Sequence, residues 1–204
     1  MKARAKRTQG VGARARLVAA ADELFSSNGI AGTPVDEAVR RAGVATMTLY
    51  HHFDGKDAFV AAYLRDRHGR WMQRWESHIS AASGPADRLL AIFDALDEWA
   101  REGGAARGCA FVDAAAELSD RAHPAWREID AHKRDLRDRL VELAESIDEI
   151  DPGGVADQLL LIYEGALSAL LTGHIEHPTA QARAMAQALL HPLGDSDTRR
   201  RLSR

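Results

Sequence analysis

Apolar residues recur every three or four positions along most of the chain, which is the spacing of one face of an α-helix. No stretch alternates apolar and polar residues beside a turn pair, so the sequence predicts no β-hairpin. Gly, Pro and capping residues interrupt the helical pattern at intervals. The sequence therefore predicts an all-α fold of nine helices, at about residues 12–28, 33–42, 45–52, 55–82, 85–103, 108–118, 123–147, 152–175 and 178–190.

The order of these helices predicts two domains. Residues 11–71 hold three short helices and the start of a long one, and residues 34–53 form a helix-turn-helix arrangement within them. Residues 72–193 hold the remaining helices. Residues 1–10 lack apolar periodicity and are predicted to form a disordered basic arm. Residues 194–204 are polar and are predicted to form a flexible tail.

The composition of the 204 residues is that of a globular protein, with 46% hydrophobic and 28% charged residues. A single Cys excludes an internal disulfide and favours a reducing compartment. No apolar region follows the basic N-terminus, so no secretory signal is predicted. The longest apolar stretch, Leu159 to Thr172, is shorter than the roughly 20 residues that span a bilayer. We therefore expect a soluble, cytoplasmic protein that does not bind membranes.

Charge is distributed unevenly along the chain. Residues 1–56 hold nine Lys and Arg against five Asp and Glu, whereas residues 57–204 hold 18 against 25. A basic front on an acidic body suggests that the front meets a polyanion. A solvated, flexible basic tail would give the same composition, and charge alone does not separate the two interpretations.

The predicted third helix presents an outward face suited to the DNA major groove. Leu49 and Phe53 are four residues apart and apolar, so they are expected to face inward. The opposite face lacks a carboxylate and would not repel phosphates. It carries hydroxyls, an imidazole and one apolar tip, from Thr46, Met47, Tyr50 and His51.

Two helix starts flank this third helix and offer anion sites, because backbone amides point outward there. Lys56 lies in the first turn of the predicted fourth helix and adds an ammonium group. The start of the second helix offers a similar site with Thr33, which is also expected to cap that helix.

Residues 14–64 resemble the DNA-binding domain of the tetracycline-repressor (TetR) family of bacterial regulators. The match is carried by Ala20-Ala21-Asp22-Glu23-Leu24-Phe25, Gly29, Gly32-Thr33, Val35, Ala42-Gly43-Val44, Thr48-Leu49-Tyr50-His51-His52-Phe53 and Lys56-Asp57-Ala58. The resemblance implies three DNA-binding helices followed by about six that form a dimerising, ligand-sensing domain. It also implies a ligand-responsive transcriptional regulator, usually a repressor that a small molecule releases from a palindromic operator.

The resemblance implies specific roles in DNA binding. Thr33, Tyr50, His52 and Lys56 would contact phosphates. Thr46, Met47 and Thr48 would lie nearest the base edges, with Tyr50 or His51 sharing that role. For His51 and His52, simple surface exposure is the alternative. Neither Arg nor Asn or Gln lies on the exposed face, so specificity is expected from methyl contacts of Thr and Met, from the N-terminal Arg residues or from DNA shape.

The four Trp residues lie between positions 71 and 126 and admit two interpretations. They could fill a packed core, as large aromatic side chains often do. They could also line an effector cavity for a small apolar or amphipathic ligand, with His68 and His132 among its polar groups. The candidate pocket residues are Trp71, Trp75, Phe93, Leu96, Trp99, Phe111, His123 and Trp126.

The last two predicted helices resemble an interface between two copies of the chain. The helix at 152–175 is apolar around most of its circumference, and Gly165, Ala169 and Gly173 form a stripe of small residues along it. Met185 and Leu189 add apolar surface from the final helix. Two such helix pairs would form a four-helix bundle in a homodimer. Burial of the same residues inside one chain is the alternative.

No catalytic motif of the G-x-S-x-G or H-E-x-x-H type occurs, and we expect no enzyme activity, metal or cofactor. Cys109 is expected to be a small buried residue, with redox sensing as the alternative. The acidic segment 113–120 is interpreted as a solvated face. The rival to a DNA-binding regulator is a helical ligand-binding or protein-interaction module whose helix-turn-helix does not bind DNA.

Overall fold

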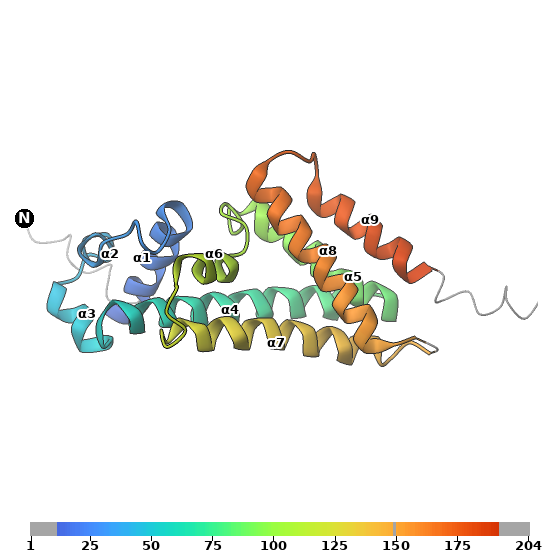
Figure 1. Cartoon of the computed structure of the whole chain (residues 1–204), viewed down its shortest axis with the longest axis horizontal. Coiled ribbons are helices and arrows are strands. Elements are labelled where there is room, and N and C mark those ends of the chain that lie inside the picture. Colours follow the sequence, from blue (N-terminus) through green and yellow to red (C-terminus); the bar gives the residue numbers. More distant parts are fainter. Residues whose placement is uncertain (1–11, 149, 192–204) are drawn as a thin grey trace, which may run out of the picture. The chain divides into compact units, whose positions relative to one another are not determined.

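The structure is a computed structural model that describes residues 12–148 and 150–191. These described residues form nine helices and no strand, which confirms the predicted all-α fold (Figure 1). The predicted arm at 1–10 and tail at 194–204 lie outside the described residues. The helices are α1 (Ala13–Asn28), α2 (Val35–Ala42), α3 (Thr46–His52), α4 (Gly55–Ala81), α5 (Pro85–Arg101), α6 (Ala110–Glu117), α7 (Ala125–Ala144), α8 (Pro152–Thr172) and α9 (Pro178–Leu190).

Glycines in the left-handed backbone region end two helices that matter for the site. Gly43 has a φ of 62° and ends α2, as the sequence predicts. Gly173 has a φ of 66° and ends α8 at Thr172, three residues before the predicted end at Ile175. The predicted cap of α2 by Thr33 is wrong. Pro34 occupies the capping position, and the Thr33 hydroxyl donates to the Gly29 carbonyl at 2.7 Å.

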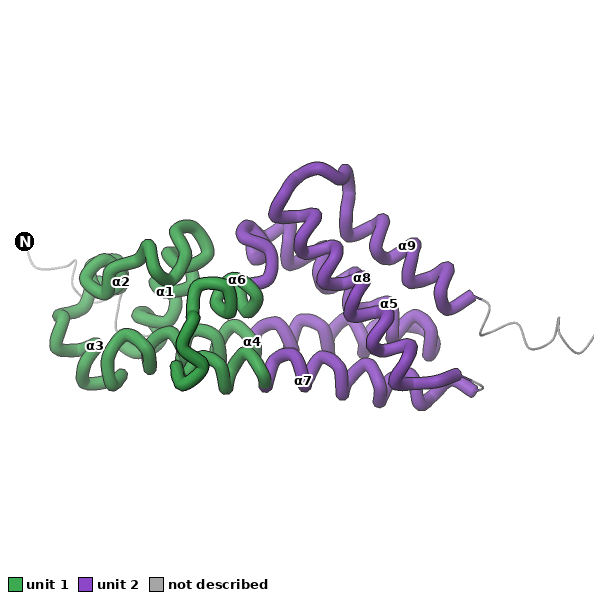
Figure 2. Tube along the Cα trace, in the orientation of Figure 1, with its two compact units in different colours: residues 1–69, 110–130 green, residues 70–109, 131–204 purple. Residues whose placement is uncertain are grey.

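By their internal contacts, the residues group into two compact units (Figure 2). Unit 1 comprises residues 1–69 and 110–130, and unit 2 comprises residues 70–109 and 131–204. The first border lies close to the predicted domain boundary at residue 71. The segment 110–130, which the sequence places in the second domain, groups with unit 1, and carboxylates of this segment accept hydrogen bonds from other residues of that unit. One example is Glu128 of α7, which accepts two hydrogen bonds from Arg65 of α4.

Aromatic side chains from α1, from α4 and from the residue after α3 hold unit 1 together. The rings of Phe25 (α1) and Tyr63 (α4) meet edge to face with centroids 5.1 Å apart. Phe53, which directly follows α3, packs on Phe59 of α4 at 5.0 Å. Arg67 of α4 is buried and donates to Asp22 of α1 at 2.6 Å. The start of α4 therefore forms the platform on which α1 and α3 are packed.

The core of unit 2 is built from the second half of α4 with α5, α7, α8 and α9. Helix α9 packs on both α5 and α8. Two polar contacts fix it to α5, because the Thr179 hydroxyl donates to Asp97 at 2.6 Å and the Arg183 Nε donates to Asp94 at 2.8 Å. The hydrogen bond from Thr179 is the main reason that the pKa of Asp97 is lowered below its ordinary value.

Helix α8 is more apolar than its neighbours. The sequence predicts that no apolar stretch is long enough to cross a membrane, but α8, with 21 residues, has the necessary length and mean hydropathy. It is alone in this among the helices of residues 12–148 and 150–191. Only 33% of its most apolar window is buried, and its large apolar side chains Leu161 and Leu171 are exposed in the part of the chain that the structure describes.

Candidate nucleic-acid interface

Helix α3 is held in place by two apolar side chains on one side. A helix of seven residues is not stable alone in water, because too few hydrogen bonds offset the cost of nucleation. Leu49 is 0% exposed and Phe53 is 6% exposed. Burying each such side chain stabilises the folded state by about 1.5–3 kcal/mol. As the sequence predicts, these two residues face inward and determine which side of α3 faces outward.

The outward side of α3 carries no carboxylate. Met47 is 75% exposed and Tyr50 is 53% exposed. Thr46, His51 and His52 are also exposed, and Thr48 is half-buried. The exposure of these residues agrees with the orientation expected from the sequence. A surface without a carboxylate can approach a phosphate backbone without electrostatic repulsion.

Basic side chains accompany α2 and α3 in unit 1. The guanidinium of Arg14, at the start of α1, lies 5.4 Å from the centre of the Phe53 ring. Arg16 donates from Nε to the Ala42 carbonyl at the end of α2, at 3.2 Å. Arg40 of α2 is exposed and has only a loose pair with Glu37, at 3.8 Å. The region around α3 therefore offers positive charge to a polyanion.

Lys56 and Thr33, two residues predicted to contact phosphates, form hydrogen bonds in the loop between α1 and α2. The Lys56 ammonium donates to the Ile30 carbonyl at 2.8 Å and is half-buried. Thr33 is 0% exposed, and its backbone N–H donates to the same carbonyl at 3.4 Å. Thr33 is therefore not part of the exposed surface. Lys56 keeps further N–H groups that can donate to a phosphate.

The sequence does not predict that Glu117 binds the loop between α1 and α2. The carboxylate of Glu117, the last residue of α6, accepts from the Ile30 N–H at 3.1 Å and from the Ala31 N–H at 2.5 Å. The interpretation of 113–120 as a solvated face is wrong for this side chain. Its partners are 86 and 87 residues away in the sequence, and no local pattern indicates such a contact. Glu117 and Lys56 together fix the loop that leads into α2.

The candidate effector residues fall into two groups. Phe111, His123 and Trp126 belong to unit 1, where His123 Nε2 lies 3.2 Å from Asp57 Oδ1. The other candidates are buried together in the core of unit 2: Trp71, Trp75, Phe93, Leu96 and Trp99. The rings of Trp71 and Trp99 meet edge to face at 5.9 Å.

The Trp residues in the core of unit 2 differ in whether their indole N–H has a hydrogen-bond acceptor. Trp99 Nε1 donates to the Gly104 carbonyl at 2.7 Å. The Nε1 atoms of Trp71 and Trp75 are buried and have no hydrogen-bond partner among the described residues. An unpaired buried donor is costly, so these two groups are the ones in this core that would gain from a hydrogen-bond acceptor.

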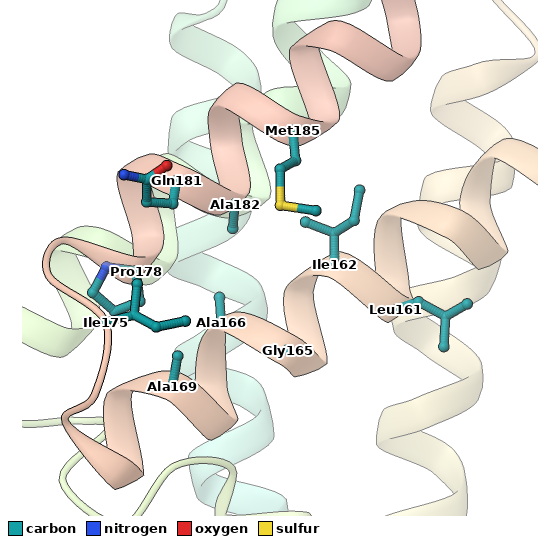
Figure 3. Close-up of a pocket in the computed structure, with 10 residues that line it drawn as sticks. All are labelled: Leu161, Ile162, Gly165, Ala166, Ala169, Ile175, Pro178, Gln181, Ala182 and Met185. Carbon is teal, nitrogen blue, oxygen red and sulfur yellow. The ribbon is translucent and has the colours of Figure 1, made fainter.

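An apolar groove of about 420 Å³ lies between α8 and α9 (Figure 3). Gly165 and Ala169 of α8 and Met185 of α9, three of the five predicted interface residues, line this groove. The other two do not line it, because Gly173 ends α8 and Leu189 packs against the core of unit 2. A Cβ atom at Gly165 would meet nothing within 4 Å. The stripe of small residues is thus open on the groove side.

Replacing Glu117 with Gln should loosen the loop between α1 and α2. The variant loses the charge that strengthens two hydrogen bonds, and its amide NH₂ faces a backbone donor. We expect the free energy of unfolding to fall by about 1 kcal/mol, as measured by urea denaturation. The amide protons of Ile30 and Ala31 should exchange faster with solvent, as measured by NMR. Glu176→Gln, at an exposed position in unit 2, is the control and should change neither. Unchanged exchange at Ile30 and Ala31 would show that Glu117 does not hold the loop.

Family models and known proteins match nearly the whole described chain. Residues 17–63 match the model for bacterial regulatory proteins of the tetR family, and residues 85–186, half of the chain, match the model for tetracyclin repressor-like C-terminal domains. The transcriptional repressor KstR2 of Mycolicibacterium smegmatis is 28% identical over 150 residues, which are 74% of this chain and 68% of that protein. The transcriptional regulator YjdC of Escherichia coli is 26% identical over 171 residues, 82% of this chain and 88% of that protein.

Solved structures agree with this assignment. The crystal structure of SCO4454, a TetR-family transcriptional regulator from Streptomyces coelicolor, aligns with a TM-score of 0.80 and 27% identity. The alignment covers 90% of this chain and 96% of that one. These relatives are transcriptional regulators, a class distinct from enzymes. The helix-turn-helix, its outward face without a carboxylate and both family models lead to one conclusion: the chain belongs to the TetR family and is a DNA-binding transcriptional regulator.

Proposed function

We propose that this regulator is a homodimeric repressor that binds a palindromic operator through α3 and releases it when a small molecule occupies unit 2. The outward face of α3 is the observation that carries the proposal. It exposes Met47 and Tyr50 without a carboxylate, while Leu49 and Phe53 fix its orientation. The name of KstR2, a repressor, supports repression over activation. Because the target is genomic DNA, we place the protein in the bacterial cytoplasm.

In the proposed complex, α3 enters the major groove and side chains around it hold the phosphates. Tyr50, His52 and Lys56 contribute hydrogen bonds to phosphate oxygens. Thr46, Met47, Thr48 and His51 lie nearest the base edges. Thr33 acts from inside the fold by shaping the loop before α2, since its hydroxyl is bound to Gly29.

Selection from a pool of random duplex DNA tests this function. We expect the enriched fragments to share an inverted repeat, with affinity that falls steeply as salt rises, because binding releases counterions. Tyr50→Phe removes a phosphate contact and should weaken binding roughly fivefold for all sequences alike. His174→Ala, an exposed residue in unit 2, is the control and should bind as the wild type does. If no fragment is enriched even in dilute buffer, the chain is a ligand-binding or protein-interaction module instead.

The proposed effector site lies in the core of unit 2, where Trp71 and Trp75 bring two unpaired indole donors one helical turn apart. The surrounding side chains are apolar, so the site suits a small apolar or amphipathic molecule that offers an acceptor. Helix α4 is continuous from Gly55 to Ala81 and contributes to both units. A ligand that binds better to the state with low DNA affinity would shift the population through this helix.

Removing one indole donor tests the effector site. Small apolar and amphipathic compounds that release the wild-type protein from its selected operator are titrated against Trp75→Phe, which keeps an aromatic ring. We expect release to need about tenfold more compound, with operator affinity unchanged in its absence, as measured by fluorescence anisotropy of labelled duplex. Trp126→Phe removes the buried, unpaired indole donor of unit 1 and is the matched control, with release expected to stay as in the wild type. Equal release of wild type and Trp75→Phe by every active compound would place the effector elsewhere.

The proposed dimer forms through the groove between α8 and α9. Exposed apolar side chains surround it, with Leu161 at 74%, Met185 at 61% and Ile175 at 52% exposed. Figure 3 shows these side chains at the groove, next to the open backbone of Gly165. A cluster of exposed apolar side chains around an apolar groove is typical of an interaction site. Two α8–α9 pairs related by a two-fold axis would cover it and would present two copies of α3 to a palindrome.

The substitution Gly165→Arg tests the dimer. There is room for a side chain at this position, so the chain should fold, while a charged side chain in the groove prevents close approach of a second α8. We expect a monomeric mass by analytical ultracentrifugation. Operator affinity should be about 100-fold lower, because the two linked helix-turn-helix units of a dimer bind one operator by avidity. Val112→Arg, at an exposed position on α6, is the control and should stay dimeric. A Gly165→Arg protein that remains a dimer would show that the interface lies on another surface.

A further inference from the structure

We propose that α3 recognises thymine through its 5-methyl group, and that Met47 is the residue that reads it. This inference rests on the DNA binding proposed above and goes beyond it by naming the chemical group that specifies the operator. It assigns one specificity-determining side chain to one base type. The argument uses the exposure of Met47, the chemistry of its neighbours on α3 and the groups that bases present in the major groove.

Met47 is held in solvent by the packing of α3. It is the most exposed large hydrophobic side chain among the described residues, at 75%. It is the second residue of α3, and it lies on the side of the helix opposite the buried Leu49 and Phe53. His51, four residues later, shares this side and is also exposed. Met47 therefore does not stabilise unit 1 by burial, and its apolar tip is available to a partner.

The remaining exposed groups on α3 exclude the strongest forms of base recognition. Guanine is read by Arg or Lys, adenine by Asn or Gln, and cytosine by Glu or Asp. Helix α3 has none of these residues along its whole length, Thr46–His52. The one apolar group that a base pair presents in the major groove is the thymine methyl. A thioether side chain on this surface therefore matches thymine and no other base.

The surroundings of Met47 favour DNA over an apolar protein partner. The α3 side chains carry no carboxylate, and exposed Arg14 and Arg40 lie on the helices that pack with α3 in unit 1. This combination of a face without carboxylates and flanking cations complements a polyanion. A partner with a purely apolar surface would leave both guanidinium groups desolvated or unused. Duplex DNA offers phosphates to the cations and a methyl group to the thioether.

Replacing thymine with uracil tests the inference, because the change removes the 5-methyl group and leaves every hydrogen-bonding group of the base in place. Each thymine of the selected operator half-site is replaced in turn, and binding is measured by competition. At one or two positions, wild-type affinity should fall about fourfold for a single half-site, the equivalent of one buried methyl group. Replacement in both half-sites should reduce it about 15-fold.

The variant Met47→Ala completes a double-mutant cycle with the uracil operators. It should bind the thymine operator about as weakly as the wild type binds the matching uracil operator, and it should not distinguish thymine from uracil at that position. Met47→Leu keeps an apolar tip and should retain the distinction. Tyr50→Phe is the control on the same helix and should weaken binding while keeping the full thymine-to-uracil difference. Met47 is exposed, so all of these proteins should show the wild-type circular dichroism spectrum.

Three results would overturn the inference. Wild-type binding that changes less than about 1.5-fold at every thymine-to-uracil position would show that no methyl group is read. A Met47→Ala protein that stays as sensitive to uracil as the wild type would assign the methyl contact to another residue, such as Thr46. Failure to select any duplex would instead remove the DNA binding on which the inference rests, and the first two results leave that function intact.

Discussion

The short length of α3 is the constraint on which the rest of the molecule depends. Seven residues cannot hold a helix in water, so α3 exists because Leu49 and Phe53 are buried against unit 1. Those two anchors also fix its rotation, because two buried side chains four residues apart leave one direction for the others. Met47, Tyr50 and His51 are exposed for this reason. Phe59 and Tyr63 of α4 therefore help to position the DNA-binding face of α3, although both are buried and neither side chain could touch DNA.

The loop before α2 is the second point of control. Lys56 binds the carbonyl of Ile30, while Glu117 binds the N–H groups of Ile30 and Ala31. A short peptide segment is thus held by a cation from α4 and an anion from α6. Helix α6 begins at Ala110 and belongs to unit 1. In the proposed mechanism, a ligand in unit 2 acts on the helix-turn-helix through α4. The hydrogen bonds of Glu117 also connect α6 directly to the loop that precedes α2.

Unit 2 combines a closed core with an open surface. Its aromatic residues are buried, and two of them, Trp71 and Trp75, keep indole donors without partners among the described residues. On its helix α8, Leu161 and Leu171 are exposed, and Gly165 is open to the groove beside α9. Unsatisfied donors and uncovered apolar surface are both costly in water, and each is relieved by a partner. A small molecule with an acceptor group suits the first, and a second copy of the chain suits the second.

The sequence by itself determined the helices, the residues that anchor α3 and the family. Helix ends depend on single local residues such as Gly43. The orientation of α3 depends on Leu49 and Phe53, which are only four residues apart in the sequence. The tertiary structure decided what depends on distant partners. It turned Thr33 inward, brought Glu117 to a loop 86 residues away and grouped residues 110–130 with unit 1. Periodicity records which side of a helix is buried, whereas the identity of the partner follows from packing between segments that no local pattern relates.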